Sequence, residues 1–230
     1  MKIRNHDTFI NMKKIAVIGL SSFGLGVVKT LADKDVEVIA VDKEGEKTNK
    51  VKTSVAQAVT MDATIRENLV SLGIDEMDHV VISTGPHLEP SIIAVLLLKE
   101  LGARHIVAKA LSADHEKILR KVGADEVAFP ERDAGEKVAH RFLFDNLLDY
   151  LPLESGAVIE EIATPEKLVG KSLEETRLRK KHNVTVIAVK SIIPDKTTIN
   201  PDGGFVLKES DILIVFGSEK EIGTLHKTFK

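Results

Sequence analysis

The sequence of 230 residues has room for one large domain, or for a medium and a small one. Its hydrophobic fraction of 43% suits a packed globular protein, and its formal net charge of -3 lacks the basic excess of most nucleic-acid binders, so no nucleic-acid partner is expected. Cysteine is absent, which excludes disulfides and thiolate metal sites and is compatible with a reducing cytoplasm.

The hydropathy of the chain also excludes a membrane-spanning segment. The longest apolar run, 92–98 (IIAVLLL), is far shorter than the roughly 20 residues that a membrane-spanning helix needs. Residues 1–11 lack the apolar stretch of a signal peptide. Because Met12 leads directly into the first apolar run, we interpret residues 1–11 as a leader or upstream start and leave them out of the fold prediction.

Six short apolar runs, separated by stretches of helical periodicity, follow between residue 12 and residue 132. The predicted strands are 15–18, 36–41, 55–60, 79–83, 105–110 and 126–129. Before the last of them, Ser112 is placed to cap a helix and Gly123 to end it. This alternation predicts an α/β fold, a doubly wound parallel sheet of Rossmann-like type over 12–132.

Residues 133–151 are predicted to form one long helix with an unusually wide apolar stripe, followed by a linker that ends at Pro152. Two interpretations remain open: a helix buried deeply in its own domain, or a helix that also packs against a second subunit. The run 92–98 raises the same question, because it leaves almost no polar face.

After Pro152 the pattern indicates a second, small α+β domain over 153–230. Its predicted strands are 157–163, 184–190 and 211–217, with a short helix over 172–180 and a closing helix. The stretch 194–204 (PDKTTINPDGG) is predicted to be turns rather than a strand.

A candidate nucleotide site lies at the strand ends of the first domain. The loop in KIAVIGLSSFGLG (14–26) comes close to the G-x-G-x-x-G fingerprint, with Ser21 at its middle glycine. Asp42 ends the second strand about 20 residues on, where a carboxylate accepts ribose hydroxyls and repels a 2′-phosphate, so NADP is disfavoured. Asp62 follows the third strand, and Thr84 and Gly85 follow the fourth. Singly, each of these could be a turn or capping residue; together they favour a site.

The motifs VIGLSSFG, VIAVDKE, MDAT, LLLKELGARHIVAKA and GADEVAFPERDAG resemble the RCK/KTN family, the cytoplasmic regulators of Trk- and Ktr-type potassium uptake systems. LVGKSLEETRLRKKHNVTVIAV and LKESDILIVFGSEKEI resemble that family's C-terminal (TrkA-C) module. The resemblance covers nearly everything from Met12 onward.

The resemblance implies a non-enzymatic gating subunit of a membrane-embedded potassium channel, held at the inner face of the cell membrane by that partner. Such proteins form dimers, with themselves or with a second RCK subunit, that assemble into octameric rings and bind ATP, ADP or NAD(H). By position, Asp42 would take the ribose, Asp62 and Ala63 would lie by the adenine, Lys109 near the phosphates and Glu131 near a subunit contact. The remaining candidate binding residues are Gly19, Ser21, Ser22, Phe23, Gly24, Lys43, Thr84 and Gly85.

The chain departs from the family's G-x-G-R loop at two positions. Ser21 adds a Cβ where the backbone approaches phosphate, and Ser22 replaces an arginine. Loss of one charge-assisted contact costs about 1.5–3 kcal/mol, roughly one to two decades of affinity. We therefore expect weakened or altered nucleotide binding, with ADP or NAD/NADH favoured over ATP.

Two rival functions remain: an NAD-dependent oxidoreductase, and an RCK scaffold subunit that binds no nucleotide. An oxidoreductase needs a catalytic acid or base, and the only histidines after Pro152, His182 and His226, are expected at the solvated surface. A serine hydrolase is set aside because Phe23 stands where G-x-S-x-G requires glycine. No paired ligands at metal-binding spacing occur, so no metal is expected.

Overall fold

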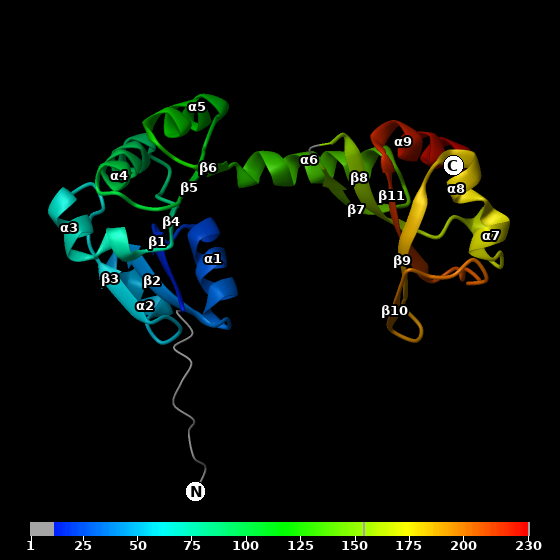
Figure 1. Cartoon of the computed structure of the whole chain (residues 1–230), viewed down its shortest axis with the longest axis horizontal. Helices are drawn as coiled ribbons and strands as arrows, with labels where there is room; N and C mark the ends of the chain where they lie inside the picture. Colours follow the sequence, from blue (N-terminus) through cyan, green and yellow to red (C-terminus); the bar gives the residue numbers. More distant parts are fainter. Residues whose placement is uncertain (1–11, 154, 230) are drawn as a thin grey trace, which may run out of the picture. The chain divides into compact units, whose positions relative to one another are not determined.

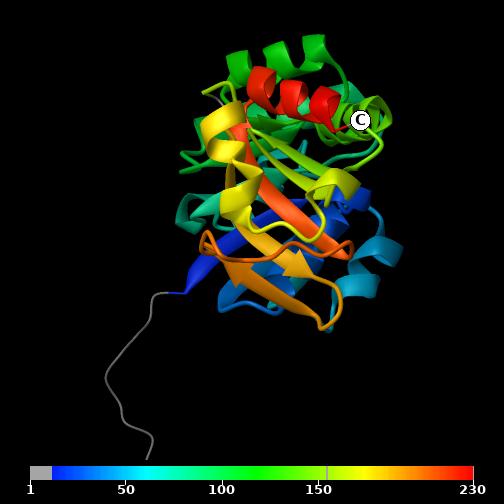
Figure 2. The same ribbon diagram turned by 90° about the vertical axis from the view of Figure 1, so that its right-hand side faces the viewer.

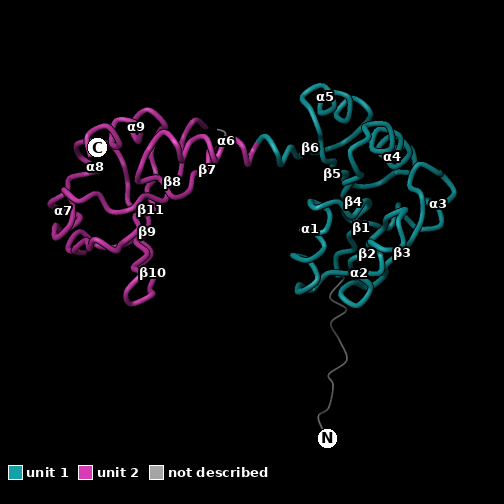
Figure 3. Tube along the Cα trace, turned by 180° about the vertical axis from the view of Figure 1, so that it is seen from behind, with its two compact units in different colours: residues 1–132 teal, residues 133–230 magenta. Residues whose placement is uncertain are grey.

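The computed structural model describes residues 12–153 and 155–229, and the predicted leader, 1–11, lies outside these described residues. The chain divides into two compact units, the first ending at Arg132 and the second beginning at Asp133 (Figure 3). Each has its own sheet and its own hydrophobic core, so each is described by itself (Figure 1).

The first unit is built on a parallel six-stranded sheet, which confirms the predicted Rossmann-like fold. Its strands are β1 (Lys13–Ile18), β2 (Val36–Asp42), β3 (Gln57–Thr60), β4 (His79–Ile82), β5 (Ile106–Lys109) and β6 (Glu126–Ala128). Their spatial order is β3-β2-β1-β4-β5-β6. The chain runs outward in both directions from β1 and β4, so the switch point at which such sheets bind ligands lies between these two strands.

Helices pack on both faces of this sheet because its central strands are apolar on both faces. They are α1 (Ser22–Ala32), α2 (Gly45–Val51), α3 (Arg66–Ser71), η1 (Ile74–Glu76), α4 (Leu88–Glu100) and α5 (Ala113–Val122). Alternate residues of β1 enter different cores: Ile18 joins the core that holds Leu98 of α4, and Val17 joins the core that holds Val28 of α1.

The caps predicted for α5 are confirmed. The Ser112 hydroxyl accepts a hydrogen bond from the His115 amide, and Gly123 adopts a left-handed conformation with φ 118°. A Cβ at Gly123 would also lie 2.6 Å from the Lys99 side chain, so both the backbone and the packing favour glycine here.

The prediction of one helix over 133–151 is wrong in its second half. Helix α6 spans Pro130–Leu143 and is followed by strand β7 (Leu147–Pro152), the outer strand of the second sheet. None of the described α6 side chains is buried, and Phe142 is 82% exposed. The apolar residues that gave the expected stripe therefore belong partly to an exposed helix and partly to a strand.

The second unit is an antiparallel sheet in the order β10-β9-β11-β8-β7. The strands β8 (Ala157–Ala163), β9 (Thr185–Ser191) and β11 (Asp211–Ser218) were predicted, whereas β7 and β10 (Lys196–Ile199) were not. The helical elements are η2 (Glu166–Leu168), α7 (Leu173–Thr176), α8 (Leu178–His182) and α9 (Glu219–Thr228). Figure 2 faces this unit and shows α8 (yellow) close to α9 (red).

The single helix expected over 172–180 is two short helices, because Arg177 between α7 and α8 has φ 53°. Ser172 begins α7 with a capping box in which the Glu175 carboxylate accepts from the Ser172 amide. Ser218 and Glu221 form the same arrangement at the start of α9. Capping boxes satisfy the free amides of a first helical turn, which stabilises helices as short as these.

His226 is buried, so its expected place at the surface is wrong. It is 4% exposed, its Nε2 lies 2.6 Å from Glu160 Oε2, and its Nδ1 lies 2.9 Å from Asn146 Oδ1. Its ring stacks on Phe144 with 4.1 Å between centroids. His182 is half-buried and tilts against the Phe229 ring. The His226 imidazole therefore ties α9 to β8 inside the core.

Breaking this buried pair tests its structural role. Glu160→Ala leaves the His226 imidazole without its acceptor, and we expect a loss of about 3 kcal/mol in the free energy of unfolding, measured by urea titration. Glu161→Ala is the matched control, because this neighbouring carboxylate lies on the other face of β8 and should change stability by less than about 1 kcal/mol. Equal losses for the two variants would contradict a special role for the pair.

Candidate functional site

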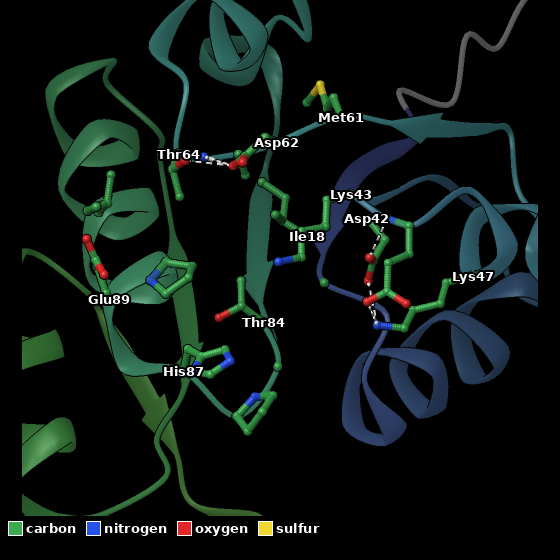
Figure 4. A pocket seen from close by; sticks show the side chains of 17 residues that line it. Ile18, Asp42, Lys43, Lys47, Met61, Asp62, Thr64, Thr84, His87 and Glu89 are labelled. Atoms are coloured by element: carbon green, nitrogen blue, oxygen red, sulfur yellow. Dashed lines mark hydrogen bonds and ion pairs between the residues drawn. The ribbon is translucent and has the colours of Figure 1, made fainter.

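A cavity of about 440 Å³ opens at the carboxyl edge of the parallel sheet, next to the switch point (Figure 4). Four loops meet there, those that follow β1, β2, β3 and β4, together with the first turns of α4. The lining residues are Ile18, Gly19, Asp42, Lys43, Glu44, Lys47, Met61, Asp62, Ala63, Thr64, Thr84, Gly85, Pro86, His87, Glu89, Pro90 and Ile93.

The glycine loop packs so closely that two of its positions have no space for a side chain. Gly19 has φ 92°, and a Cβ there would lie 2.3 Å from the Ser83 carbonyl oxygen. A Cβ at Gly24 would lie 2.1 Å from the Gly19 carbonyl oxygen. Contacts this short do not occur between real atoms, so glycine at both positions is required for the loop to reach the end of β4 and for α1 to begin there.

The serine at the middle glycine position is directed toward β4. Ser21 is the N-cap residue of α1, but its side chain caps no helical amide. Its Oγ instead lies 2.5 Å from Oγ of Ser83, which is fully buried at the end of β4. Ser22, Phe23 and Gly24 begin α1 and, like Ser21, do not line the cavity. The structure thus places Gly19 at the cavity and the rest of the predicted phosphate loop beside it.

Asp42 is buried between two loops, with 7% of its surface exposed. Its Oδ2 accepts the Leu20 amide at 2.7 Å and its Oδ1 accepts the Glu44 amide at 3.0 Å. The Lys47 ammonium lies 3.7 Å from Oδ2 and 2.7 Å from Glu44 Oε1. This carboxylate therefore joins the loop after β1 to the loop after β2, and each oxygen keeps a lone pair for a ligand.

Asp62 provides a second carboxylate on the wall that follows β3. Its Oδ1 accepts the Thr64 amide at 2.9 Å and the Thr64 hydroxyl at 2.7 Å. These two hydrogen bonds, with a smaller contribution from the Lys43 charge, lower the pKa of the Asp62 carboxyl. The group is therefore an ionised acceptor at neutral pH, with Oδ1 occupied by Thr64 (Figure 4).

Lys109 and Glu131 do not line the cavity. The Lys109 side chain is 11% exposed, and its ammonium donates to Glu131 Oε1 at 2.6 Å and holds the pKa of that carboxyl below its usual value. The predicted site residues that the structure does gather around the cavity are Gly19, Asp42, Lys43, Asp62, Ala63, Thr84 and Gly85.

Part of the cavity wall was missed by the sequence analysis. His87 and Glu89 come from the start of α4, and Lys47 comes from α2 (Figure 4). His87 and Glu89 follow the predicted Thr84-Gly85 pair by only a few residues, so their position in the same loop was a signal that could have identified them. Lys47 carried no such signal, because only the packing of α2 shows that its ammonium returns to Asp42.

The lining carries more carboxylates than ammonium groups. Four carboxylates, of Asp42, Glu44, Asp62 and Glu89, line it, against two ammonium groups, of Lys43 and Lys47. Among the described residues, no group of three or more acidic or histidine side chains is arranged to hold a metal ion. No helix in the described parts of the chain is long and apolar enough to cross a membrane. Because carboxylates predominate in its lining, the cavity is suited to a ligand that donates hydrogen bonds to them.

Family comparisons divide the chain in the same way as the two kinds of sheet. Residues 15–130 match the TrkA-N domain and residues 157–230 match the TrkA-C domain. The sequence is 37% identical over 215 residues to Ktr system potassium uptake protein C of Bacillus subtilis, covering 94% of this chain and 96% of that protein. It is 34% identical to Ktr system potassium uptake protein A of Vibrio alginolyticus, covering 94% and 97%.

Solved structures share the fold at lower identity. The GsuK RCK domain superposes with a TM-score of 0.66 at 17% identity, over 99% of this chain and 50% of that chain. The GsuK channel bound to NAD gives a TM-score of 0.68 at 17% identity, over 99% and 40%. This chain therefore spans half or less of those solved chains, and at this identity the likeness shows the fold.

Two glycines of α1 form a matched pair that tests the close packing of the loop. Gly24→Ala places a Cβ against the Gly19 carbonyl, and we expect the free energy of unfolding to fall by about 2 kcal/mol or more. A Cβ at Gly26 would have no atom within 4 Å, so Gly26→Ala should raise stability by about 0.5–1 kcal/mol. Urea unfolding measures both, and opposite signs are the expected result.

Proposed function

The chain belongs to the RCK/KTN family of potassium uptake regulators, and from that membership we propose that it is a nucleotide-responsive regulatory subunit, not an enzyme, that gates a membrane potassium channel or transporter. The observation that carries this is the near full-length similarity to Ktr system proteins, at 37% identity over 94% of the chain. The cavity at the switch point supplies the place at which a regulatory ligand would bind.

The proposed ligand is an adenine nucleotide. GsuK, whose fold the chain shares, has been solved bound to NAD and bound to ADP. In this chain Asp42 would accept the ribose hydroxyls and Asp62 would face the adenine with Ala63. The phosphates would extend from the cavity past Gly19 to the first amides of α1, which lie beside it and where the helix dipole favours negative charge. We propose Lys109 and Glu131 only as outer contacts of the nucleotide, because they form an ion pair with each other.

The cavity supports a preference for ligands of lower charge. Carboxylates outnumber ammonium groups in the lining, and Ser22 provides no guanidinium. ATP, with the largest charge to neutralise, would be disfavoured relative to ADP or NAD/NADH. NADP would be disfavoured most strongly, because its 2′-phosphate would approach the buried Asp42 carboxylate.

The proposed assembly is a dimer, of this chain with itself or with a second RCK subunit, within an octameric ring below the membrane partner. The exposed apolar side chains Val138, Phe142 and Leu143 of α6 support a helix that packs on another chain. The proposed domain limits are 12–132 for the nucleotide domain, 133–152 for the connecting segment and 153–230 for the C-terminal domain. The ring would lie in the cytoplasm, at the inner face of the membrane.

A nucleotide panel tests the proposed site. Thermal unfolding is measured against ATP, ADP, AMP, NAD and NADH, and a ligand at about 100 times its Kd should raise Tm by roughly 5–10 °C. We expect ADP and NAD to shift Tm more than ATP at equal concentration. No shift with any member would indicate the rival scaffold role, and turnover of hydroxy acids with NAD would indicate the rival oxidoreductase.

Restoring the missing arginine tests why ATP is disfavoured. Ser22→Arg should tighten ATP binding by roughly ten- to a hundredfold, because a guanidinium adds a charge-assisted contact to phosphate. Ser54→Arg adds the same charge at an exposed turn before β3, and should leave the Kd within about twofold. Equal effects of the two substitutions would mean that only net charge matters.

Growth on limiting potassium tests the gating role. In Bacillus subtilis cells that lack Ktr system protein C, the chain should restore growth, and Asp42→Asn should restore less because it weakens nucleotide binding. Glu37→Gln, a carboxylate at the start of β2, is the control and should behave as the parent chain. Full rescue by Asp42→Asn would separate gating from this nucleotide site.

A further inference from the structure

A buried histidine lies directly behind the cavity wall. His115, in the first turn of α5, is 1% exposed. Its Nε2 lies 3.0 Å from Oγ of Ser91 in α4, and its Nδ1 lies 3.2 Å from the Leu111 amide nitrogen. Ser91 directly follows Pro90, which lines the cavity. The one ring therefore joins the loop after β5 to the helix that forms one cavity wall.

The hydrogen-bond partners determine which ring nitrogen carries the proton. The Leu111 amide can only donate, so Nδ1 must accept and carries no hydrogen. The Ser91 hydroxyl donates to the Leu88 carbonyl oxygen at 2.6 Å, so Ser91 Oγ must accept from Nε2–H. Both contacts are made only by the neutral imidazole with its proton on Nε2.

Protonation of Nδ1 would break this arrangement. The new N–H would point at the Leu111 N–H, and two donors cannot share a buried contact. The ring would have to move, and Ser91 would lose its donor. Ser91 and Leu88 both belong to the first turns of α4, the segment that also carries His87, Glu89 and Pro90 of the cavity wall (Figure 4).

We propose that His115 is a positioning residue for the nucleotide cavity, which holds the start of α4 in place only while its imidazole is neutral, so that nucleotide affinity weakens as the pH falls. This inference rests on the proposed nucleotide site and adds to it a proton as a second, competing regulator. Ser91 is the residue through which the ring acts on the wall.

Charged groups near His115 do not counter the effect of burial on the pKa of its imidazole. Near His115 in sequence, α5 carries Asp114, which pairs with Lys117, and Glu116, which pairs with Arg120 and Arg132. The start of α4 contributes Glu89 and His87, and β5 contributes Lys109, paired with Glu131. Burial is the cause that lowers the pKa of His115.

The sign of the pH effect follows from that direction. The folded chain takes up the His115 proton at lower pH than the unfolded chain does, so the contribution of His115 to stability is present above about pH 6.5 and is lost as the pH falls below it. If the bound state requires the neutral ring, ligand and proton compete, and affinity falls once the pH drops below the pKa of His115 in the free folded protein, which burial holds below the unfolded value.

NAD is the probe, because its diphosphate bridge has no terminal phosphate group and so does not titrate in the range used, unlike the terminal phosphate of ADP. Every protein carries His87→Gln, which removes the imidazole that lines the cavity itself. Calorimetric titration of the full chain from about pH 8 to about pH 5 should show a Kd for NAD that is constant above the pKa of His115 in the free protein and rises by roughly threefold or more below it, as the competent fraction falls. A Kd that stays constant below that pKa would overturn the proposal.

His115→Gln tests the assignment to this ring. Glutamine provides an amide N–H near the position of Nε2 and does not titrate. We expect NAD binding at about pH 8 to stay within roughly threefold of the parent, and the pH dependence to disappear. His79→Gln, at the amino end of β4 and so at the opposite sheet edge, is the matched control and should keep the full pH dependence. An unchanged pH profile in His115→Gln would overturn the proposal.

A measurement without substitution at His115 keeps the test independent of folding. The ring nitrogens are followed by NMR with and without NAD. By reciprocity of linkage, NAD should lower the pKa of His115, and the free protein should show the Nε2–H tautomer. An equal pKa in both states would overturn the proposal. Absence of NAD binding at about pH 8 would instead refute the proposed nucleotide site.

Discussion

The approach of the Gly19 backbone to the end of β4 is the contact on which the rest of the site depends. No atom can be added at Gly19 or Gly24 without meeting a carbonyl oxygen at 2.1–2.3 Å. Because the loop is this close, the Leu20 amide reaches the Asp42 carboxylate at 2.7 Å, and α1 begins at the switch point. The same closeness brings Ser21 within hydrogen-bond distance of Ser83. Loop, helix start and acidic residue therefore form one unit of structure.

The carboxylates of the site have structural as well as binding roles. Asp42 joins two loops through backbone amides, and Asp62 shapes its own turn through Thr64. The hydroxyl and amide of Thr64 stabilise the ionised form of the Asp62 carboxyl. Removing either carboxylate would thus change the shape of the cavity as well as its charge.

Strands with a regular hydrophobic pattern were predictable from the sequence. The features that were mispredicted depend on tertiary contacts. The six parallel strands are visible in the sequence because each is an apolar run bounded by turn residues. Strand β7 resembles the end of a helix, because its apolar residues continue the helical stripe of α6; pairing with β8 decides its conformation, and no local signal carries that information. Strand β10 lies in a turn-rich stretch and gains its structure from β9. His226 looks like a surface residue because its partners, Glu160 and Asn146, are distant in sequence.

The residues of the site also fall into those that the sequence predicts and those that only the structure reveals. This difference has a consequence for regulation. Asp42, Asp62 and Thr84 lie at or just after strand ends, so sequence spacing predicts them, whereas Ser91 and His115 act from behind the wall and are visible only in three dimensions. With serines in place of glycine and arginine, the proposed site has little charge with which to hold phosphate. Its affinity then depends on how well the walls are preorganised. A site of this kind responds strongly to small displacements of one wall, so a single buried proton behind α4 has more influence here than it would beside an arginine.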